Sequence, residues 1–326
     1  MSTTAAETVG GPTTPDPPIE GKAIVGRTPW QLFWGRFLQD RFALAGLAFV
    51  GLLVLMALCA PLVAHLVGHG PNELFQRQMT DVFGLPKGPT SSFWMGADSS
   101  GRDVFVRVVY GARVSLLVGI VATGVAVAVG VTLGMLAGYF GGWVDTLISR
   151  VTDIILSMPV LLFAIGIVAA CSSSKEGCLN GTLKPGLPLV IVVISLFTWP
   201  YVARLVRGNT LSLREREFVE ASRSLGAGNV RIMFREILPN LLSPIIVYAS
   251  LLIPSNILFE AYLSFLGLGV PSDTPSWGRM VSDSLEIFDV AWWLMLFPGL
   301  FLLFTVLAFN LLGDGLRDAL DPRANR

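Results

Sequence analysis

Long apolar stretches alternate with short polar ones along the chain from Phe42 onward. A helix rises about 1.5 Å per residue, so about 20 apolar residues suffice to cross a hydrocarbon layer roughly 30 Å thick. Each stretch reaches that length, and the pattern predicts an all-α, polytopic membrane protein of six transmembrane helices. The predicted spans are Phe42–Leu66, Val114–Tyr139, Trp143–Ala170, Leu187–Arg207, Leu241–Leu268 and Val290–Leu312.

The composition supports the same class of protein. Of the 326 residues, 53% are hydrophobic and only 14% are charged, and the mean hydropathy is +0.66. These values are too apolar for an ordinary soluble domain. The formal net charge is zero, so nothing in the composition indicates a nucleic-acid partner.

Lys and Arg are divided unequally between the two sides of the predicted membrane. An even number of spans places both termini on one side, together with the segment around residues 204–240. That side holds fourteen Lys and Arg residues and the other side holds eight, with Arg150 inside a predicted span. The positive-inside rule therefore predicts that both termini and this segment are cytoplasmic.

Residues 212–240 form a densely charged segment between two long apolar stretches. We call this segment the elbow. Ser212 followed by Glu215 fits a capping box, which predicts the start of a short amphipathic helix. Apolar residues alternate with charged ones at helical spacing as far as Leu225, so the helix is expected to end there.

The second half of the elbow is predicted to be another helix. Gly226 supplies the turn after the first helix, and Asn229 is placed to cap the helix Val230–Leu238. Pro239 then leads into the next span. The expected result is a pair of short helices on the cytoplasmic face of the membrane.

The sequence shows no recognisable motif for nucleotide binding, metal binding or catalysis. No GxxxxGK[ST] sequence is present to cradle nucleotide phosphates. His65 and His69 lie four residues apart, but no third ligand occurs at metal-binding spacing, so they are interpreted as interfacial polar residues. The sequence therefore predicts no catalytic residue, no metal site and no cofactor.

The elbow resembles a known motif at specific positions. Its residues Glu220, Ala221, Ser222, Gly226, Ile237, Leu238 and Pro239 resemble the EAA motif of permease subunits in ABC importers. Ser222 departs from the commonest third residue, Ala, but both are small. Residues 94–116, 150–162 and 260–280 resemble the dipeptide and oligopeptide permease C subunits of that superfamily.

The resemblance implies a function and a set of partners. It implies a permease of the ABC importer type I fold in the bacterial inner membrane, forming half of a passage for peptides. The implied partners are a homologous second permease, one or two ATP-binding cassette subunits that hold ATP and Mg, an extracytoplasmic substrate-binding protein, and membrane lipid. The implied contacts with the ATPase are Glu220, Ala221, Ser222, Leu225, Gly226 and Ala227.

The expected domain organisation follows from the spans and the resemblance. Residues 1–28 are rich in Thr, Pro, Gly and Ala, which predicts a disordered cytoplasmic tail. Residues 29–113 would supply an amphipathic entry, the first span and an extracytoplasmic segment. Residues 114–312 would form the core permease domain with five spans and the elbow, and residues 313–326 a cytoplasmic tail.

Several residues within the spans have more than one interpretation. Gly130, Gly134 and Gly138 lie four apart and allow a helix to pack closely, either from the same bundle or across a homodimer seam. Asp153 and Glu260 are costly in a membrane. They could contact the amino terminus of a substrate, or pair with Arg150 or a neighbouring helix, or lie at the interface.

Two further features remain open at this stage. Cys171 and Cys178 flank a short loop that the topology places outside, where they could form a disulfide or remain free thiols. Pro159 interrupts a predicted span and favours a kink. Residues 94–113 are expected to form an extracytoplasmic ledge against a partner.

The alternative function is a secondary transporter or channel that works alone on an ion gradient. Such proteins usually place coupling residues deep in several spans. Only Asp153 and Glu260 are available here, and neither explains the elbow. A membrane enzyme is disfavoured by the lack of a nucleophile, a base and metal ligands.

Overall fold

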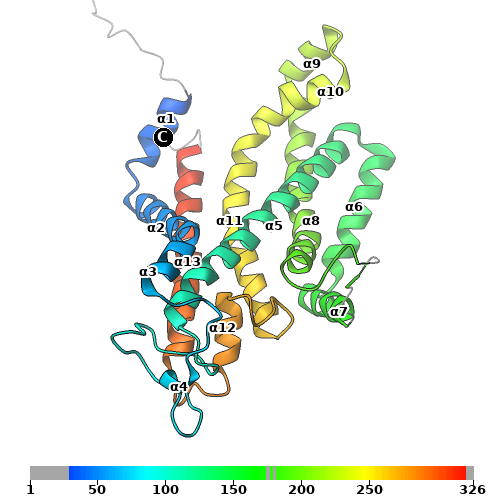
Figure 1. The fold of residues 1–326 in the computed structure, drawn as a ribbon. Coiled ribbons are helices and arrows are strands. Elements are labelled where there is room, and N and C mark those ends of the chain that lie inside the picture. Colours follow the sequence, from blue (N-terminus) through cyan, green and yellow to red (C-terminus); the bar gives the residue numbers. More distant parts are fainter. Residues whose placement is uncertain (1–28, 174–176, 179–180, 321–326) are drawn as a thin grey trace, which may run out of the picture.

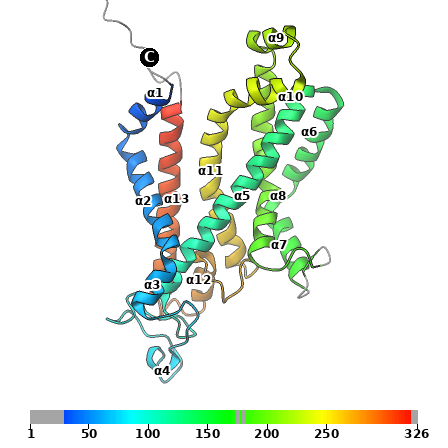
Figure 2. The ribbon, with the colours of Figure 1, turned by 45° about the horizontal axis from the view of Figure 1, so that its top comes forward.

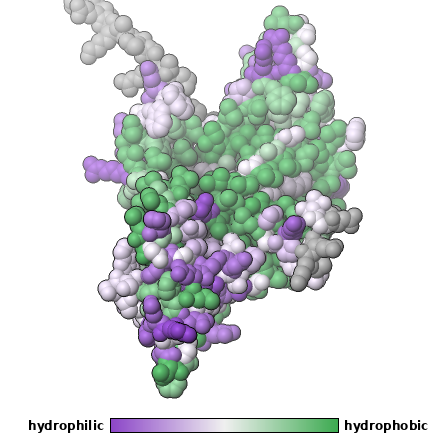
Figure 3. Space-filling view, viewed as in Figure 1, coloured by the Kyte–Doolittle hydropathy of each residue, from purple (hydrophilic) through white to green (hydrophobic). Residues whose placement is uncertain are grey.

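The computed structural model describes residues 29–320 except 174–176 and 179–180. The expected N-terminal tail, residues 1–28, lies outside the described residues. Of the expected C-terminal tail, residues 313–326, residues 321–326 also lie outside them, whereas residues 313–320 continue the last helix. Helices dominate the described part, and its surface carries a broad apolar band between two more polar ends (Figure 3). The helices are α1 Pro29–Phe37, α2 Arg41–Leu58, α3 Ala60–Val67, α4 Gln76–Met79, α5 Val104–Phe140, α6 Gly142–Ser157, α7 Val160–Ser172, α8 Leu187–Leu213, α9 Glu217–Ser224, α10 Asn229–Arg231, the π-helix η1 Ile232–Ile237, α11 Leu238–Phe265, α12 Trp277–Ser284 and α13 Trp293–Leu320.

Among the described residues, five helices are long and apolar enough to cross a membrane. They are α2, α5, α8, the continuous helix Asn229–Phe265 and α13. A sixth span results only if α6 and α7 are taken together as one bent span. Each of these five helices covers all or most of one predicted span, and the bent pair stands in the place of the sixth.

The predicted span Trp143–Ala170 is broken at Pro159, where the sequence indicated a kink. The chain bends by 87° between α6 and α7. Met158 is extended, with ψ at 141°, and Pro159 precedes the first residue of α7. A proline pushes the residue before it out of the helical region and cannot donate a helical hydrogen bond, so the helix ends there.

The predicted span Phe42–Leu66 is also divided. Helix α2 ends at Leu58, Cys59 leaves the helical region with ψ at 3°, and α3 begins at Ala60. Pro61 lies in the first turn of α3, where its missing N–H costs no hydrogen bond.

Helix α5 begins ten residues before the predicted Val114, so the expected ledge at residues 94–113 is helical over its second half. Asp103 caps the new start, because its carboxylate accepts hydrogen bonds from the backbone N–H groups of Phe105 and Val106. The loop that remains outside the helices therefore ends at Asp103.

Helix α5 is the central element and packs along α8 through its glycine face. A Cβ on Gly130 would lie 2.5 Å from the Cβ of Val202, and a Cβ on Gly138 would lie 2.7 Å from that of Thr210. These approaches leave no room for a side chain on α5. The glycine face is thus occupied by a helix of the same chain, not by a second copy.

The ends of the bundle differ in what they carry. Figure 1 shows α1, the end of α13 and α9 together at one end, and α4 and α12 at the other, and Figure 2 shows the same arrangement after rotation. The described chain ends, Pro29 and Leu320, therefore lie at the same end of the bundle as the elbow.

Candidate coupling site and polar sites of the bundle

The first helix of the elbow, α9, begins later than the capping box predicts. Helix α8 continues to Leu213, so Ser212 lies inside it. Helix α9 begins at Glu217, and its N-cap residue Arg216 makes no side-chain capping bond. The prediction fails because α8 packs against α5 beyond the end of its apolar run, with Thr210 fully buried. Helical structure therefore extends past the position of the expected cap.

The second half of the elbow is continuous with the following span. Helices α10, η1 and α11 form one helix from Asn229 to Phe265. Gly228, not Asn229, is the N-cap residue, and the Asn229 side chain instead accepts a hydrogen bond of 2.9 Å from the Tyr139 hydroxyl. The π-helical turn lies just before Pro239, whose ring would crowd a carbonyl in a regular α-helix.

The turn of the elbow presents the side chains that the motif singled out. Glu220, Ala221, Leu225 and Gly226 are exposed, and the remaining two, Ser222 and Ala227, are partly exposed. Leu225 is 88% exposed, although it is apolar. Gly226 has φ at +79°, a left-handed conformation that costs a residue with a Cβ about 1–2 kcal/mol. The predicted turn at Gly226 is confirmed.

The elbow is held firmly against the bundle on its other side. Val219 of α9 is fully buried and belongs to a cluster with Tyr139 and Ile232. The Arg214 guanidinium donates hydrogen bonds to the backbone carbonyls of Gly138 and Tyr139, at 3.0 and 3.4 Å. These contacts attach the elbow to the carboxyl end of α5.

Two ion pairs join α6 to α8 near the elbow. Arg204 donates a hydrogen bond of 2.6 Å to Asp153, and Arg207 contacts both carboxylate oxygens of Asp145, one of them at 2.7 Å. A cavity of about 390 Å³ lies beside these pairs, between α5, α6 and α8. Asp153 therefore pairs with a neighbouring helix, which is one of the interpretations the sequence left open.

Glu260 lies in the interior of the bundle. It is fully buried, accepts a hydrogen bond of 2.6 Å from Ser264 and lies 3.5 Å from the Ser115 hydroxyl of α5. A side chain without exposed surface cannot reach a substrate in this conformation. The structure therefore places Glu260 as a buried polar group between α11 and α5.

A second polar cluster lies at the opposite end, within the expected ledge, and its burial was not predicted from the sequence. Arg107 is only 1% exposed and lies 3.6 Å from Asp98, which pairs with Arg102 at 2.7 Å. Both arginines also donate to the backbone carbonyl of Ser272, at 3.1 and 3.2 Å. The cluster ties the loop before α5 to the loop before α12.

His69 makes a close side-chain contact with Asp103. Its Nδ1 lies 2.6 Å from a carboxylate oxygen of Asp103, and its ring stacks on Phe93. No group of three or more His, Cys, Asp or Glu residues able to hold a metal occurs in the described part of the chain.

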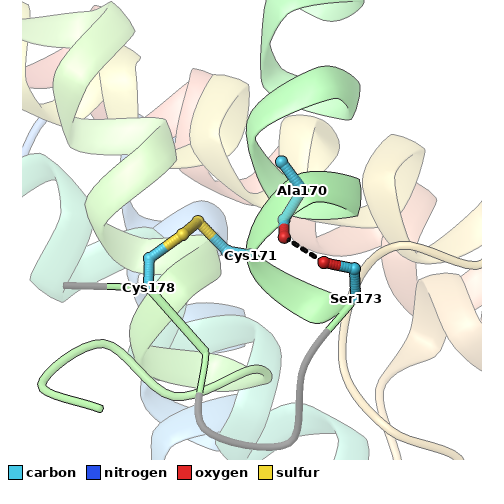
Figure 4. The surroundings of a disulfide bond; sticks show 4 residues. All are labelled: Ala170, Cys171, Ser173 and Cys178. Carbon is cyan, nitrogen blue, oxygen red and sulfur yellow. Dashed lines mark hydrogen bonds between the residues drawn. A yellow bond between two sulfur atoms is a disulfide. The ribbon is translucent and has the colours of Figure 1, made fainter. Parts of the chain in front are cut away.

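Cys171 and Cys178 form a disulfide in the structure (Figure 4). The bond joins the last turn of α7 to the segment that leads to α8. Backbone hydrogen bonds between Cys178 and Leu183 hold that segment as a short bridge. Residues 174–176, inside the loop that the disulfide closes, lie outside the described residues.

Comparison with known proteins gives consistent matches over nearly the whole chain. A family model described as "Binding-protein-dependent transport system inner membrane component" matches residues 130–326. A second model, "N-terminal TM domain of oligopeptide transport permease C", matches residues 28–81.

Two relatives illustrate the similarity. The glutathione transport system permease protein GsiD of Pectobacterium atrosepticum is 42% identical over 94% of this chain and 95% of its own length. The dipeptide transport system permease protein DppC of Alkalihalophilus pseudofirmus is 41% identical over 96% and 95%. Among solved structures, an inward-facing MetNI methionine ABC transporter chain superposes with a TM-score of 0.55 at 20% identity, covering 67% of this chain and 97% of that one.

Proposed function

The chain belongs to the family of binding-protein-dependent transport system inner membrane components, and from that membership we propose that it forms half of the passage of an ATP-driven importer for small peptides. It is a multi-span, non-enzymatic permease component of a bacterial inner-membrane importer. The single observation that carries the proposal is similarity above 40% identity, over more than nine tenths of both chains, to permeases named for glutathione and for dipeptides.

The proposed substrates are peptides of about the size of a dipeptide or a tripeptide. Both kinds of relative carry short peptides according to their names. We propose that a separate extracytoplasmic binding protein selects among such peptides and delivers them. In this arrangement the permease itself needs to recognise only the chemical groups that all short peptides have in common.

The proposed partners are a homologous but unlike second permease and one or two ATP-binding cassette subunits. ATP hydrolysis, with its Mg, belongs to those subunits, because no nucleotide-binding motif occurs in this sequence. The contact with the ATPase is the elbow, through Glu220, Ala221, Ser222, Leu225, Gly226 and Ala227. The exposure of Leu225 at the turn supports this role, because it leaves the side chain accessible to a partner subunit.

The proposed orientation places both chain ends and the elbow in the cytoplasm. The excess of Lys and Arg on that side supports it, and so does the position of the elbow at the same end of the bundle as the described chain ends (Figure 1). The disulfide between Cys171 and Cys178 then lies on the oxidising, extracytoplasmic side, where disulfides persist.

The proposed mechanism uses the elbow as a lever. When the ATPase subunits close on ATP, they move the elbow, and the buried contacts of Val219 and Arg214 pass the movement to α5 and α8. The movement tilts these helices and opens the passage outward to accept peptide. The rigid attachment of the elbow supports this mechanism, because a loosely tethered loop would absorb the motion.

Uptake in cells tests the proposed function. In a strain without other peptide importers, the chain expressed with its cognate partners should support uptake of a radiolabelled dipeptide, and omission of the ATPase should abolish it. Uptake by the chain alone, driven by an ion gradient, would instead establish the secondary-transporter alternative.

A further inference from the structure

A groove of about 390 Å³ opens on the side of the bundle between α7, α8 and α11. Its volume falls within the range of about 300–1,000 Å³ typical of sites for small ligands. The bend between α6 and α7 forms one wall, because Val160 and Leu161 follow the break directly. The other lining residues are Phe197, Thr198, Tyr201, Leu252, Ser255, Asn256, Phe259 and Tyr262.

The floor of the groove is a buried polar network. Asn256 is 4% exposed, donates a hydrogen bond of 2.8 Å to Thr123 of α5 and accepts one of 3.0 Å from Thr198 of α8. A side-chain amide has two N–H donors. The second N–H of Asn256 has no acceptor among the described residues, so a buried amide that lines the groove retains an unused donor.

The rim of the groove adds exposed hydroxyls. Tyr201 and Tyr262 are 44% and 54% exposed, and neither hydroxyl has a hydrogen-bond partner in the part of the chain that the structure describes. Ser255 is also exposed, and its hydroxyl donates only to the carbonyl of Leu251. Polar groups on a membrane-spanning surface are unfavourable against lipid, so this face is better suited to protein, water or a polar ligand.

None of the residues that line the groove carries a charge. The groove therefore offers hydroxyl and amide groups together with the rings of Phe197 and Phe259. A peptide bond presents one N–H and one C=O per residue, and both groups need partners when they leave water. This surface therefore matches the N–H and C=O groups of an extended peptide backbone. The match does not depend on the charges of the peptide's side chains.

We propose that the groove between α7, α8 and α11 is the surface on which this subunit contacts the peptide in transit. Asn256 and the rim hydroxyls would form hydrogen bonds with the peptide backbone. The proposal rests on the proposed function and assigns the contact to residues other than Asp153 and Glu260. Such a groove would let one permease accept peptides with different side chains, because it binds the shared peptide backbone and not the side-chain charges.

Cysteine labelling tests the proposal in the assembled transporter. Cys59 is the only free cysteine of this chain, so Cys59→Ala gives a parent without free thiols on this subunit. Ser255→Cys then places one thiol in the groove with almost no change in size. The matched control is Leu303→Cys on α13, which is exposed and, like Ser255, lies ten residues from the end of its helix nearest α12.

The expected result separates the two positions. A membrane-impermeant maleimide should label Ser255→Cys, and a transported dipeptide at about ten times its dissociation constant should slow that labelling about tenfold. An equal concentration of a non-peptide solute, such as glucose, should not. Leu303→Cys should react only with a lipid-soluble maleimide, at a rate that dipeptide leaves unchanged.

Three outcomes would overturn the inference. Labelling of Ser255→Cys only by the lipid-soluble reagent would make the groove a lipid-facing surface, and a disulfide or crosslink from this position to the second permease would make it a subunit interface. Labelling of Ser255→Cys at the same rate with and without dipeptide would show that the peptide does not bind in the groove. In each case, ATPase-dependent dipeptide uptake by the transporter with the unchanged chain would leave the proposed function standing, whereas the absence of that uptake would overturn both.

Discussion

Gly134 of α5 lies directly against the backbone of Ala203 on α8: a Cβ added to Gly134 would stand 2.5 Å from the Ala203 carbonyl oxygen. That oxygen belongs to the backbone of a packed helix, so it cannot move aside cheaply. The close approach of α5 and α8 therefore depends on the absence of a side chain at this position. The same two helices carry the elbow at their adjacent ends, which makes this contact part of the proposed coupling path.

Gly134→Ala is expected to destabilise the protein in detergent by about 1–3 kcal/mol, because the new methyl group overpacks the α5–α8 contact. Gly124→Ala is the control on the same helix, since a Cβ there meets nothing within 4 Å. The control should be neutral or slightly stabilising, because alanine has a better helix propensity than glycine by about 1 kcal/mol. Thermal unfolding of both variants measures the difference, and equal midpoints would contradict the packing argument.

Gly226→Val is expected to reduce peptide uptake strongly without lowering the amount of protein in the membrane. The left-handed φ of +79° disfavours a β-branched residue, so the turn that carries Leu225 must change shape. Gly228→Val is the matched control two residues away, because the backbone there is extended with φ at −71° and ψ at 157°. Transport assays with quantified membrane protein compare the two, and equal uptake by both variants would argue against a shaped docking turn.

Glu260→Gln is expected to keep uptake close to that of the unchanged protein. The partners of Glu260 are the hydroxyls of Ser115, Ser264 and Ser276, which can donate or accept and so suit an amide as well as a carboxylate. Glu260→Ala should instead lower stability, because it leaves a cavity and unpaired hydroxyls. Loss of uptake in a stable Glu260→Gln protein would show that the carboxylate itself is needed, as in recognition of a peptide amino group.

The two ion pairs between α6 and α8 are expected to differ in strength. The Arg204–Asp153 side chains are 54% and 52% exposed, and such pairs contribute about 1 kcal/mol or less. The Arg207–Asp145 side chains are 36% and 20% exposed and share two contacts, so their coupling energy should be larger. Double-mutant cycles on thermal stability measure both energies, and a larger value for Arg204–Asp153 would contradict this ranking.

The length of apolar runs predicted the membrane class and the approximate positions of the spans, because the bilayer imposes both length and composition. Breaks within runs were harder to predict. Pro159 was expected to kink a span, but the 87° bend divides it into two helices. At Cys59 the break has no local signal beyond Pro61 two residues later, since both flanking segments are equally apolar.

Boundaries set by tertiary packing could not be predicted from local motifs. Ser212 and Glu215 form a capping box in sequence, yet packing of α8 on α5 extends the helix past Ser212. Arg107 carries the same charge as the surface arginines around it, and only the contacts with Asp98 and the loop carbonyls explain its burial. Such contacts join residues far apart in the chain, so no local pattern reveals them.

The elbow motif was the most informative part of the sequence because its chemistry is local. A turn at Gly226 needs only a residue that tolerates a positive φ, and the small residues around it leave the turn open to a partner. The groove between α7, α8 and α11 was not foreseen, because its polar residues are scattered over three helices and none is charged. From the sequence, the carboxylates of Asp153 and Glu260 were considered as substrate contacts instead.

Photocrosslinking from Leu225 tests the central claim most directly. A photoreactive amino acid at Leu225, which is 88% exposed, is compared in intact cells with one at Val82, which is 94% exposed. Val82 follows α4, which lies at the opposite end of the bundle (Figure 1). We predict that position 225 crosslinks to the ATP-binding subunit and that position 82 does not. A crosslink to the ATPase from position 82, or access of an impermeant reagent to position 225 from outside the cell, would contradict the account.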